Sequence, residues 1–498
     1  MKTELISTGT PGLDEILGGG LPRNRAYLIQ GEPGVGKTTL GLQFLLAGRD
    51  SGESGLYVCL SETEEELEEI AQSHGWTTEG VTIFQLSPGS DALTGDEENT
   101  LFHPSEVELA EISSTLLDQV QKVQPKRVVF DSLSEIRLLA QSGARYRRQI
   151  LALKEFFTRR NCTVWFLDDS TDLTGDRHLQ TIAHGVMALE QRAPIFGPYR
   201  RRMKIVKLRG IEFISGYHDF RIIRSGLRVY PRLVAAEHRE AHQLQPLLSG
   251  VPRLDALTGG GLDRGNSTLL MGPAGTGKSA VAMQFCVAAA ERGERSVLFN
   301  FDETTQSVIK RSQGFGIDLK KYLAAGLLEI RQIDPGEMPP GEFLSLVREA
   351  VEEKNTRVVV IDSLNGYLNA MPDESFLTIQ MHELLTYLGQ KGVASILIVS
   401  QAGLIGSAVD APIDLSYLAD CVILLRYFEF SGEVRKAISV LKKRTGLHET
   451  AIRELRLSSE GIHLGEPLRE FTGVLQGIPR LNGQSDLESD ELDARAAG

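Results

Sequence analysis

Two glycine-rich segments of the chain carry the residues of a phosphate-binding loop. They are Gly31–Thr38 (GEPGVGKT) and Gly272–Ser279 (GPAGTGKS). Glycines allow the backbone amides to surround phosphate oxygens, and a following helix adds positive potential at its amino end. The lysine would contact the β- and γ-phosphates, and the last hydroxyl would bind Mg²⁺. The spacing therefore predicts two sites for ATP and Mg²⁺.

The predicted ligand contacts include both loops and the acidic residue that ends a later apolar strand in each half. The expected nucleotide contacts are Gly31, Gly34, Gly36, Lys37, Thr38, Thr39 and Asp131, and Gly272, Gly275, Thr276, Gly277, Lys278, Ser279, Ala280 and Asp362. Asp131 ends RVVFD and Asp362 ends RVVVID. An aspartate in this context holds the metal of a P-loop NTPase. We expect Thr38 with Asp131, and Ser279 with Asp362, to bind Mg²⁺.

Hydrolysis also needs a group that orients or deprotonates the attacking water. Suitable carboxylates follow the next strand: Glu62 in the first half, and Asp302 and Glu303 in the second. The carboxyl edge of an open α/β sheet is where ligands bind. The alternative for Glu62 and Glu303 is stabilisation of a helix N-terminus. We predict a catalytic role for all three.

These motifs recur at a fixed separation, which indicates an internal duplication. The lead-in Gly9-x-Pro-x-Leu-Asp14 returns 241 residues later, at Gly250–Asp255, as does the segment GGGL that begins at Gly18. We predict two homologous domains, residues 1–238 and 239–478, joined through a polar linker or short helix near 235–245. An acidic tail, 479–498, has few apolar residues and is expected to be disordered.

Strands and helices are predicted to alternate within each half. In the first half, strands are expected at 26–31, 56–60, 127–131 and 163–167, and helices at 37–48, 62–73, 106–123 and around 147–159. Near-continuous apolar strands are typical of parallel sheets covered on both faces. Late strands at 202–208 and 437–442 are expected to form hairpins. The fold class is α/β, with a mostly parallel β-sheet flanked by helices in each domain.

The composition excludes several classes of protein. With 498 residues, 41% hydrophobic and 24% charged, most of the chain is not disordered. A net charge of −13 argues against nucleic-acid binding as the main activity. The four cysteines are isolated and are expected to be reduced and buried. We expect a cytoplasmic protein, because neither a secretion signal nor a membrane-spanning stretch is recognisable.

Together the motifs resemble those of the KaiC family, a branch of the RecA-like ATPases. The resemblance covers roughly residues 5–475 and includes the lead-in, the P-loops, the Asp-Ser strand ends and a late Lys-x-Arg motif. It implies two tandem RecA-like P-loop NTPase domains in a homohexameric ring, with ATP between neighbouring subunits. Lys207, Arg209, Lys442 and Arg444 would then reach the γ-phosphate bound by the next subunit. Without the resemblance, the residues alone favour solvent-facing side chains on an edge strand.

The chain departs from the family pattern at two places. The family's paired glutamates correspond to Ser61-Glu62 and Asp302-Glu303. The first site therefore lacks one carboxylate, and we expect its hydrolysis to be slow or to depend on Glu62 alone. Asp302 stands where the family places its kinase base. The family's phosphorylated Ser-Thr pair falls on Ser416-Tyr417, which leaves Ser416 as the candidate phosphoacceptor.

The leading hypothesis is an ATP-hydrolysing ring protein with serine/threonine autokinase activity in its second domain and an unknown signalling partner. One alternative is a RecA-like nucleic-acid motor or recombinase, which the acidic charge disfavours. Another is a non-catalytic, nucleotide-dependent assembly switch, which Ser61 favours for the first half. The basic cluster 200–204 could contact phosphate or form a solvated strand start.

Overall fold

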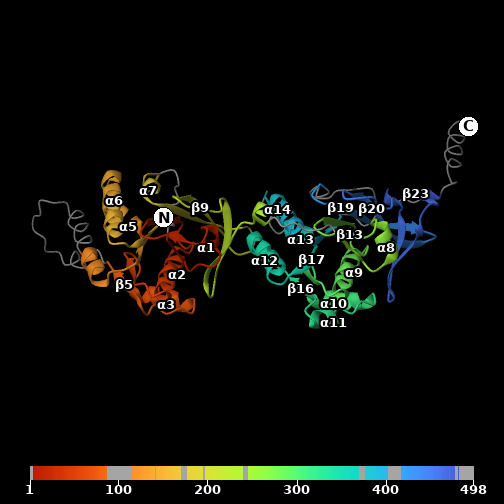
Figure 1. Cartoon of the computed structure of the whole chain (residues 1–498), viewed down its shortest axis with the longest axis horizontal. Coiled ribbons are helices and arrows are strands. Elements are labelled where there is room, and N and C mark those ends of the chain that lie inside the picture. The colour runs from red at the N-terminus through yellow and green to blue at the C-terminus, as the bar shows by residue number, and fades with distance from the viewer. Residues whose placement is uncertain are drawn as a thin grey trace, which may run out of the picture. The chain divides into compact units, whose positions relative to one another are not determined.

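The computed structural model describes residues 4–86, 115–140, 142–169, 177–194, 197–238, 245–369, 376–401, 417–476 and 480–481. The chain divides into two compact units (Figure 1). Met1–Arg232 forms most of the first, and Leu233–Met338 with Phe343–Gly498 forms the second. Each unit contains a nine-stranded sheet. The predicted α/β fold with two tandem RecA-like domains is confirmed.

The first sheet has the order β11-β10-β9-β8-β3-β7-β6-β4-β5. Its parallel strands are β3 (Ala26–Gly31), β4 (Gly55–Cys59), β5 (Val81–Gln85), β6 (Arg127–Asp131), β7 (Thr163–Asp168) and β8 (Gly185–Arg192). An antiparallel extension adds β9 (Arg200–Leu208), β10 (Tyr217–Ile223) and β11 (Gly226–Tyr230). The strands at 26–31 and 127–131 lie where the sequence predicts them, and β9 forms the expected hairpin.

Helices cover both faces of this sheet, as Figure 1 shows. They are α1 (Leu13–Ile16), α2 (Lys37–Asp50), α3 (Glu64–Ser73), α5 (Leu133–Ala140), α6 (Gly143–Arg159) and α7 (Arg177–Ile182), together with the helical residues 115–123, the described part of the helix expected at 106–123. Because strand side chains alternate between faces, each strand contributes to two cores. Val129 and Trp165 pack toward α2, and Trp165 stacks on Phe44 with 4.2 Å between ring centroids. Phe130 and Phe166 pack on the opposite face with Phe157 of α6.

The second sheet repeats this plan in the order β16-β15-β17-β18-β14-β19-β20-β21-β22. Its strands are β14 (Ser267–Gly272), β15 (Arg295–Asn300), β16 (Leu328–Gln332), β17 (Thr356–Asp362), β18 (Ala394–Ser400), β19 (Cys421–Phe430), β20 (Glu433–Lys443), β21 (Arg453–Ser458) and β22 (Gly461–Pro467). Its helices are α8 (Pro252–Leu257), α9 (Lys278–Glu291), α10 (Thr305–Gly314), α11 (Lys320–Ala324), α12 (Pro340–Glu352), α13 (Leu364–Asn369) and α14 (Leu377–Gln390). Strands β19 and β20 form the second expected hairpin.

The repeated lead-in motif builds the same hydrogen-bonded turn in each domain. Asp14 accepts from the backbone amide of Thr8 at 2.8 Å and from its hydroxyl at 2.7 Å. Asp255 accepts the equivalent two bonds from Ser249, both at 2.7 Å. A buried hydroxyl needs a partner, so the turn requires this aspartate. The motif is therefore structural.

Short elements flank the two sheets. They are the strand pairs β1 (Leu5–Ile6) with β2 (Leu21–Pro22), β12 (Pro246–Leu247) with β13 (Leu262–Asp263) and β23 (Phe471–Thr472) with β24 (Arg480–Leu481), and the 3₁₀ turns at Ala235–His238 and Val474–Gln476. Part of the segment expected as a linker is thus a 3₁₀ turn, and the expected tail begins with β24. All four cysteines are free and buried, as predicted. Among the described helices, none is long and apolar enough to cross a membrane.

Candidate nucleotide-binding sites

Each P-loop joins the central strand of its sheet to a long helix. In the first domain the loop connects β3 to α2. The ammonium of Lys37 is buried and donates to the carbonyls of Gly31 at 2.9 Å and Glu32 at 3.0 Å. It also forms an ion pair with Asp169 at 2.8 Å. The loop thus already holds its lysine at the point where phosphates would lie.

The second P-loop holds its lysine in a similar way, between β14 and α9. Lys278 donates to the carbonyls of Gly272 and Pro273, both at 2.8 Å. Burial lowers the pKa of Lys278 to about 8, and the charge of Asp362 partly opposes this shift. An anionic phosphate would favour the charged ammonium. Thr276 closes the loop by donating to Pro273 O at 2.9 Å.

Glycines in both loops have backbone conformations that other residues rarely adopt. The φ angles are +77° at Gly34, +112° at Gly36, +78° at Gly275 and +106° at Gly277. Left-handed backbone costs an ordinary residue about 1–2 kcal/mol. These glycines therefore set the shape of the loop. The predicted contacts Thr39 and Ala280 lie buried in the first turns of α2 and α9.

The predicted metal ligands are adjacent in both domains. The Thr38 hydroxyl donates to Asp131 Oδ2 at 3.1 Å. Burial raises the pKa of Asp362, and a hydrogen bond from Ser279 partly offsets the rise. A hydroxyl with a carboxylate is a donor set that suits Mg²⁺, which takes further ligands from phosphate and water. Among the described residues, no group of three or more His, Cys, Asp or Glu could hold a metal without such help.

Tyr57 is a functional candidate that the sequence analysis missed. Its hydroxyl donates to Asp131 Oδ2 at 2.5 Å from a fully buried position on β4. Burial and the Glu62 charge raise the pKa of Asp131 to about 6, and the Tyr57 and Thr38 hydrogen bonds work against this rise. The residue 241 positions later is Leu298. Only the pairing of β4 with β6 brings the phenol to the carboxylate.

The predicted water-activating carboxylates lie at the carboxyl edge of each sheet. Glu62 accepts from the Ser61 hydroxyl at 3.0 Å and precedes Thr63, which caps α3. Asp302 accepts from Ser363 at 2.5 Å. Glu303 forms an ion pair with Arg311 of α10. The structure therefore brings each group to the strand end beside its metal carboxylate, Asp131 or Asp362.

The Lys-x-Arg residues lie away from the P-loop of their own domain. Lys207 donates to Gln180 O, and Arg209 donates to Thr181 O at 3.1 Å. Lys442 donates to Ala419 O at 2.8 Å, and Arg444 pairs with Asp420 at 3.2 Å. The register of β8 with β9 places Leu208 beside Gly185, at the amino end of a parallel strand. The loops follow carboxyl ends, so the structure does not bring motif and loop together within one domain.

Two further predicted features have different outcomes. Ser416 lies outside the described residues; the next residue, Tyr417, is exposed.

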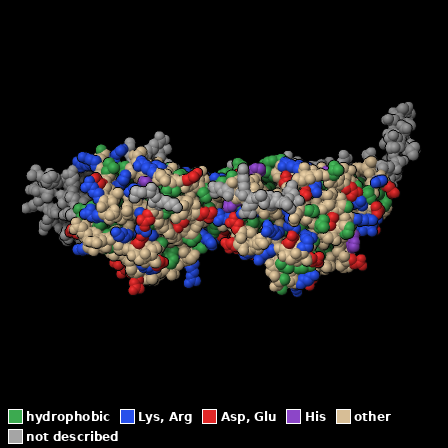
Figure 2. Space-filling model, viewed as in Figure 1, with side chains coloured by type: hydrophobic (Ala, Val, Ile, Leu, Met, Phe, Trp, Pro, Cys, Tyr) green, Lys and Arg blue, Asp and Glu red, His purple; other side chains and the backbone are tan. Residues whose placement is uncertain are grey.

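In the basic cluster, Arg202 and Lys204 both pair with Glu190 at 3.0 Å. This cluster is therefore partly neutralised by its own domain. On the face shown in Figure 2, acidic and basic side chains are interspersed over both units.

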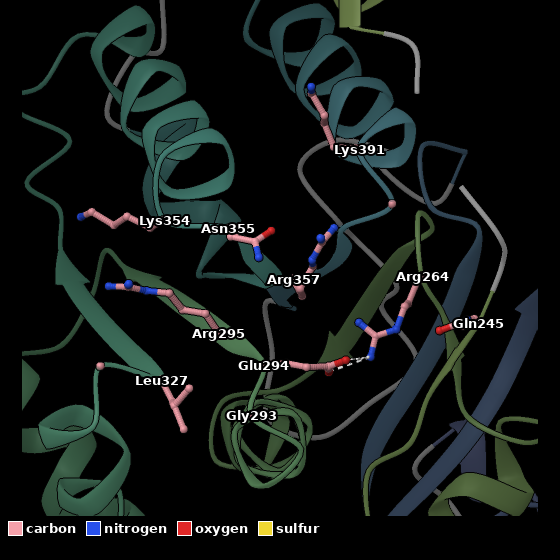
Figure 3. A pocket seen from close by; sticks show the side chains of 12 residues that line it. Gln245, Arg264, Gly293, Glu294, Arg295, Leu327, Lys354, Asn355, Arg357 and Lys391 are labelled. Carbon is pink, nitrogen blue, oxygen red and sulfur yellow. Dashed lines mark hydrogen bonds and ion pairs between the residues drawn. The ribbon is translucent and has the colours of Figure 1, made fainter. Parts of the chain in front are cut away.

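A hollow of about 650 Å³ lies in the second domain, lined by residues that precede β15, β17 and β18 (Figure 3). Its cations are largely paired: Arg264 with Glu294 at 2.7 Å, and Lys354 with Glu329 at 3.3 Å. These residues lie at the amino ends of parallel strands, whereas the P-loop follows a carboxyl end. The hollow is thus separate from the nucleotide site.

Comparisons with known proteins agree with this geometry. The sequence model of the KaiC ATPase family matches residues 6–234 and 247–469. The chain is 28% identical over 504 residues to the circadian clock protein KaiC3 of Synechocystis, covering 97% of this chain and 96% of that protein. It is 27% identical to the circadian clock oscillator protein KaiC of Picosynechococcus over 486 residues, covering 95% and 92% of the two chains. The KaiC of Synechococcus elongatus is also 27% identical, over 489 residues, with 95% and 91% covered.

Proposed function

Because this chain belongs to the KaiC family of ATPases and has two tandem domains of that family, we propose that both P-loops bind Mg-ATP and that both sites hydrolyse it. The observation that carries the proposal is the pairing of a P-loop hydroxyl with a strand-end carboxylate, Thr38 with Asp131 at 3.1 Å. Lys37 and Lys278 stand in the loops where a γ-phosphate would be bound. Mg²⁺ would neutralise phosphate charge between these groups.

In the proposed reaction, the chain's carboxylates orient the attacking water. The water oxygen bonds to the γ-phosphorus, the bond from phosphorus to the β–γ bridging oxygen breaks, and ADP leaves with that electron pair. The water proton passes to a carboxylate and then to solvent. Glu62 serves the first site in this scheme, and Asp302 with Glu303 serves the second.

We further propose that the sites are completed by a second copy of the chain in a homohexameric ring. Lys207, Arg209, Lys442 and Arg444 lie at the edge opposite to their own P-loops, so they cannot serve those sites. A cation supplied by a neighbour would stabilise charge on the transferring phosphoryl group. In a ring, the opposite edges of adjacent domains could face each other, which supports the proposal.

The finer part of the proposal is autokinase activity of the second domain in clock-like signalling. Asp302 would accept the proton of the Ser416 hydroxyl, whose oxygen would take the γ-phosphoryl group while ADP leaves. The curated relatives carry circadian clock names, which supports this role. The first domain has Ser61 in place of a carboxylate and is not proposed to act as a kinase.

The test compares Lys37→Ala, Lys278→Ala and wild type after incubation with radiolabelled Mg-ATP. We expect Lys278→Ala to abolish incorporation of label, and Lys37→Ala to reduce phosphate release or ring assembly while leaving labelling. Intact mass and native mass report phosphate count and subunit number. Equal labelling of wild type and Lys278→Ala would refute the kinase proposal. Unchanged phosphate release in the double variant Lys37→Ala/Lys278→Ala would refute the ATPase proposal.

A further inference from the structure

The two nucleotide sites distribute their acidic residues differently along the sheet edge. In the first domain, the residue after β4 that matches the family's first glutamate is Ser61, and the residue after β7 is Asp169. In the second domain, the corresponding residues are Asp302 after β15 and Ser400 at the end of β18. A serine and an aspartate have therefore exchanged places between the domains.

Strand register establishes that Asp169 corresponds to Ser400. Both sheets pair the P-loop strand in parallel with the strand concerned: Gln30 lies opposite Asp168, and Met271, its equivalent 241 positions later, lies opposite Val399. Asp169 and Ser400 each follow by one residue. The backbone amide of each also bonds to a side chain at an equivalent position, Ser134 or Asn365.

A hydrogen bond that the two domains share follows the same exchange. Ser132, which comes after Asp131, donates its hydroxyl to Asp169 Oδ2 at 2.9 Å. Ser363, which comes after Asp362, donates to Asp302 Oδ2 at 2.5 Å. The strand that precedes this serine lies between the two strands concerned in each sheet, so the serine can reach either end. In each domain this serine donates to the aspartate at the end of the adjacent strand, Asp169 in the first domain and Asp302 in the second.

Asp169 faces the phosphate-binding loop as well as Ser132. Its Oδ1 lies 2.8 Å from the ammonium of Lys37, and its side chain is 37% exposed. Although partial burial works against ionisation, the Lys37 ion pair and the serine hydrogen bonds keep the pKa of Asp169 below its ordinary value. This carboxylate follows β7, the strand that lies between the P-loop strand β3 and the strand β6 that ends in Asp131.

We propose that Asp169 supplies the first site with the second acidic group that Ser61 does not provide. The inference rests on the proposed hydrolysis of ATP. When the phosphates draw Lys37 away, Asp169 keeps its hydrogen bond from Ser132 and, with Glu62, positions the attacking water. The bonds that form and break are those given above for hydrolysis. Asp169 is thus a positioning residue whose place in the second site is taken by Asp302.

The test uses the full chain with Lys278→Ala, so that phosphate release reports the first site. Asp169→Ser is compared with the exchange variant Ser61→Asp/Asp169→Ser, and with Asp50→Ser as a control at an exposed position. We expect Asp169→Ser to lower kcat by at least about 10-fold, because such groups contribute about 10²–10⁴. The calorimetric Kd for Mg-ADP should change by less than about 3-fold. The exchange variant should recover kcat to within about 3-fold of its parent.

Each other outcome has a defined meaning. Unchanged kcat with tighter Mg-ADP binding would show that Asp169 only competes for Lys37, and would overturn the inference. Failure of the exchange variant to recover, with folding verified by circular dichroism, would also overturn it. If Asp169→Ser does not fold, Asp169→Asn keeps the shape and must show the same loss. An inactive parent would refute the proposed hydrolysis at the first site, whereas an active parent with unaffected Asp169 variants would refute this inference alone.

Discussion

The two P-loops offer a matched test of how backbone conformation controls nucleotide affinity. Gly34 and Gly275 occupy equivalent positions with φ angles of +77° and +78°. A Cβ on Gly34 would meet nothing within 4 Å, but a Cβ on Gly275 would lie 2.6 Å from the hydroxyl oxygen of Tyr427. Substitution by alanine therefore isolates a backbone cost at Gly34 and adds a steric cost at Gly275.

The magnitudes follow from these contacts. Left-handed backbone costs alanine about 1–2 kcal/mol. An alanine loop that relaxes to another conformation when empty must regain the left-handed one on binding, so we expect Mg-ADP binding about 5- to 30-fold weaker for Gly34→Ala. At Gly275 the tyrosine must also move, and its hydrogen bond to Ala274 O, 3.1 Å long, would be lost. A hydrogen bond of this kind contributes about 1 kcal/mol, so we expect Gly275→Ala to lose about fivefold more.

The assay is titration calorimetry with Mg-ADP on full chains whose other P-loop lysine is alanine. The double variant Gly275→Ala/Tyr427→Phe removes the steric conflict but keeps the backbone cost. Its loss of Mg-ADP affinity, measured against Tyr427→Phe, should therefore equal the loss that Gly34→Ala shows against its own parent. Equal losses for the two single glycine variants would refute the reasoning. So would a double variant that recovers nothing.

Two further predictions concern stability. His218 is buried, and burial lowers its pKa to about 4, so below pH 6.5 the unfolded chain takes up the proton before the folded chain does. The free energy of unfolding should therefore fall by about 3 kcal/mol between pH 6.5 and 4. In denaturant titrations, His218→Gln should flatten this pH dependence. Arg127→Met removes a buried cation that pairs with Glu53 at 2.6 Å and donates to Ser7 O and Phe44 O. Calorimetric scans should show the first domain destabilised by about 3–5 kcal/mol. The second domain, in which Val358 is the equivalent residue, should be unchanged.

Local motifs made most of the fold and the loop sites predictable. The P-loops and the strand-end aspartates are contiguous segments whose residue types carry their own conformation, such as the glycines with positive φ. The strand at 127–131 was equally predictable, because its three central residues, Val128–Phe130, form an uninterrupted apolar run that is fully buried. These features depend on neighbours in the sequence, so composition and spacing suffice.

Residues that act across strands were not predictable in the same way. Tyr57 reaches Asp131, and Asp169 reaches both Lys37 and Ser132, only through the order of strands in the sheet. A tyrosine in an apolar strand is indistinguishable by pattern from a core residue. Asp169 follows another aspartate at a strand end, and nothing in that pair indicates which one faces the loop. The register of β7 against β3 supplies this information.

The stacked pair Phe44–Trp165 gives the chain a spectroscopic property. The chain has two tryptophans, Trp76 and Trp165, and both belong to the first domain. Phe44 is on the helix that begins at Lys37, so the indole of Trp165 rests on the element that carries the loop. Indole emission from the intact protein therefore reports the first domain alone. The duplicated chain carries a natural fluorescent label on one of its two halves.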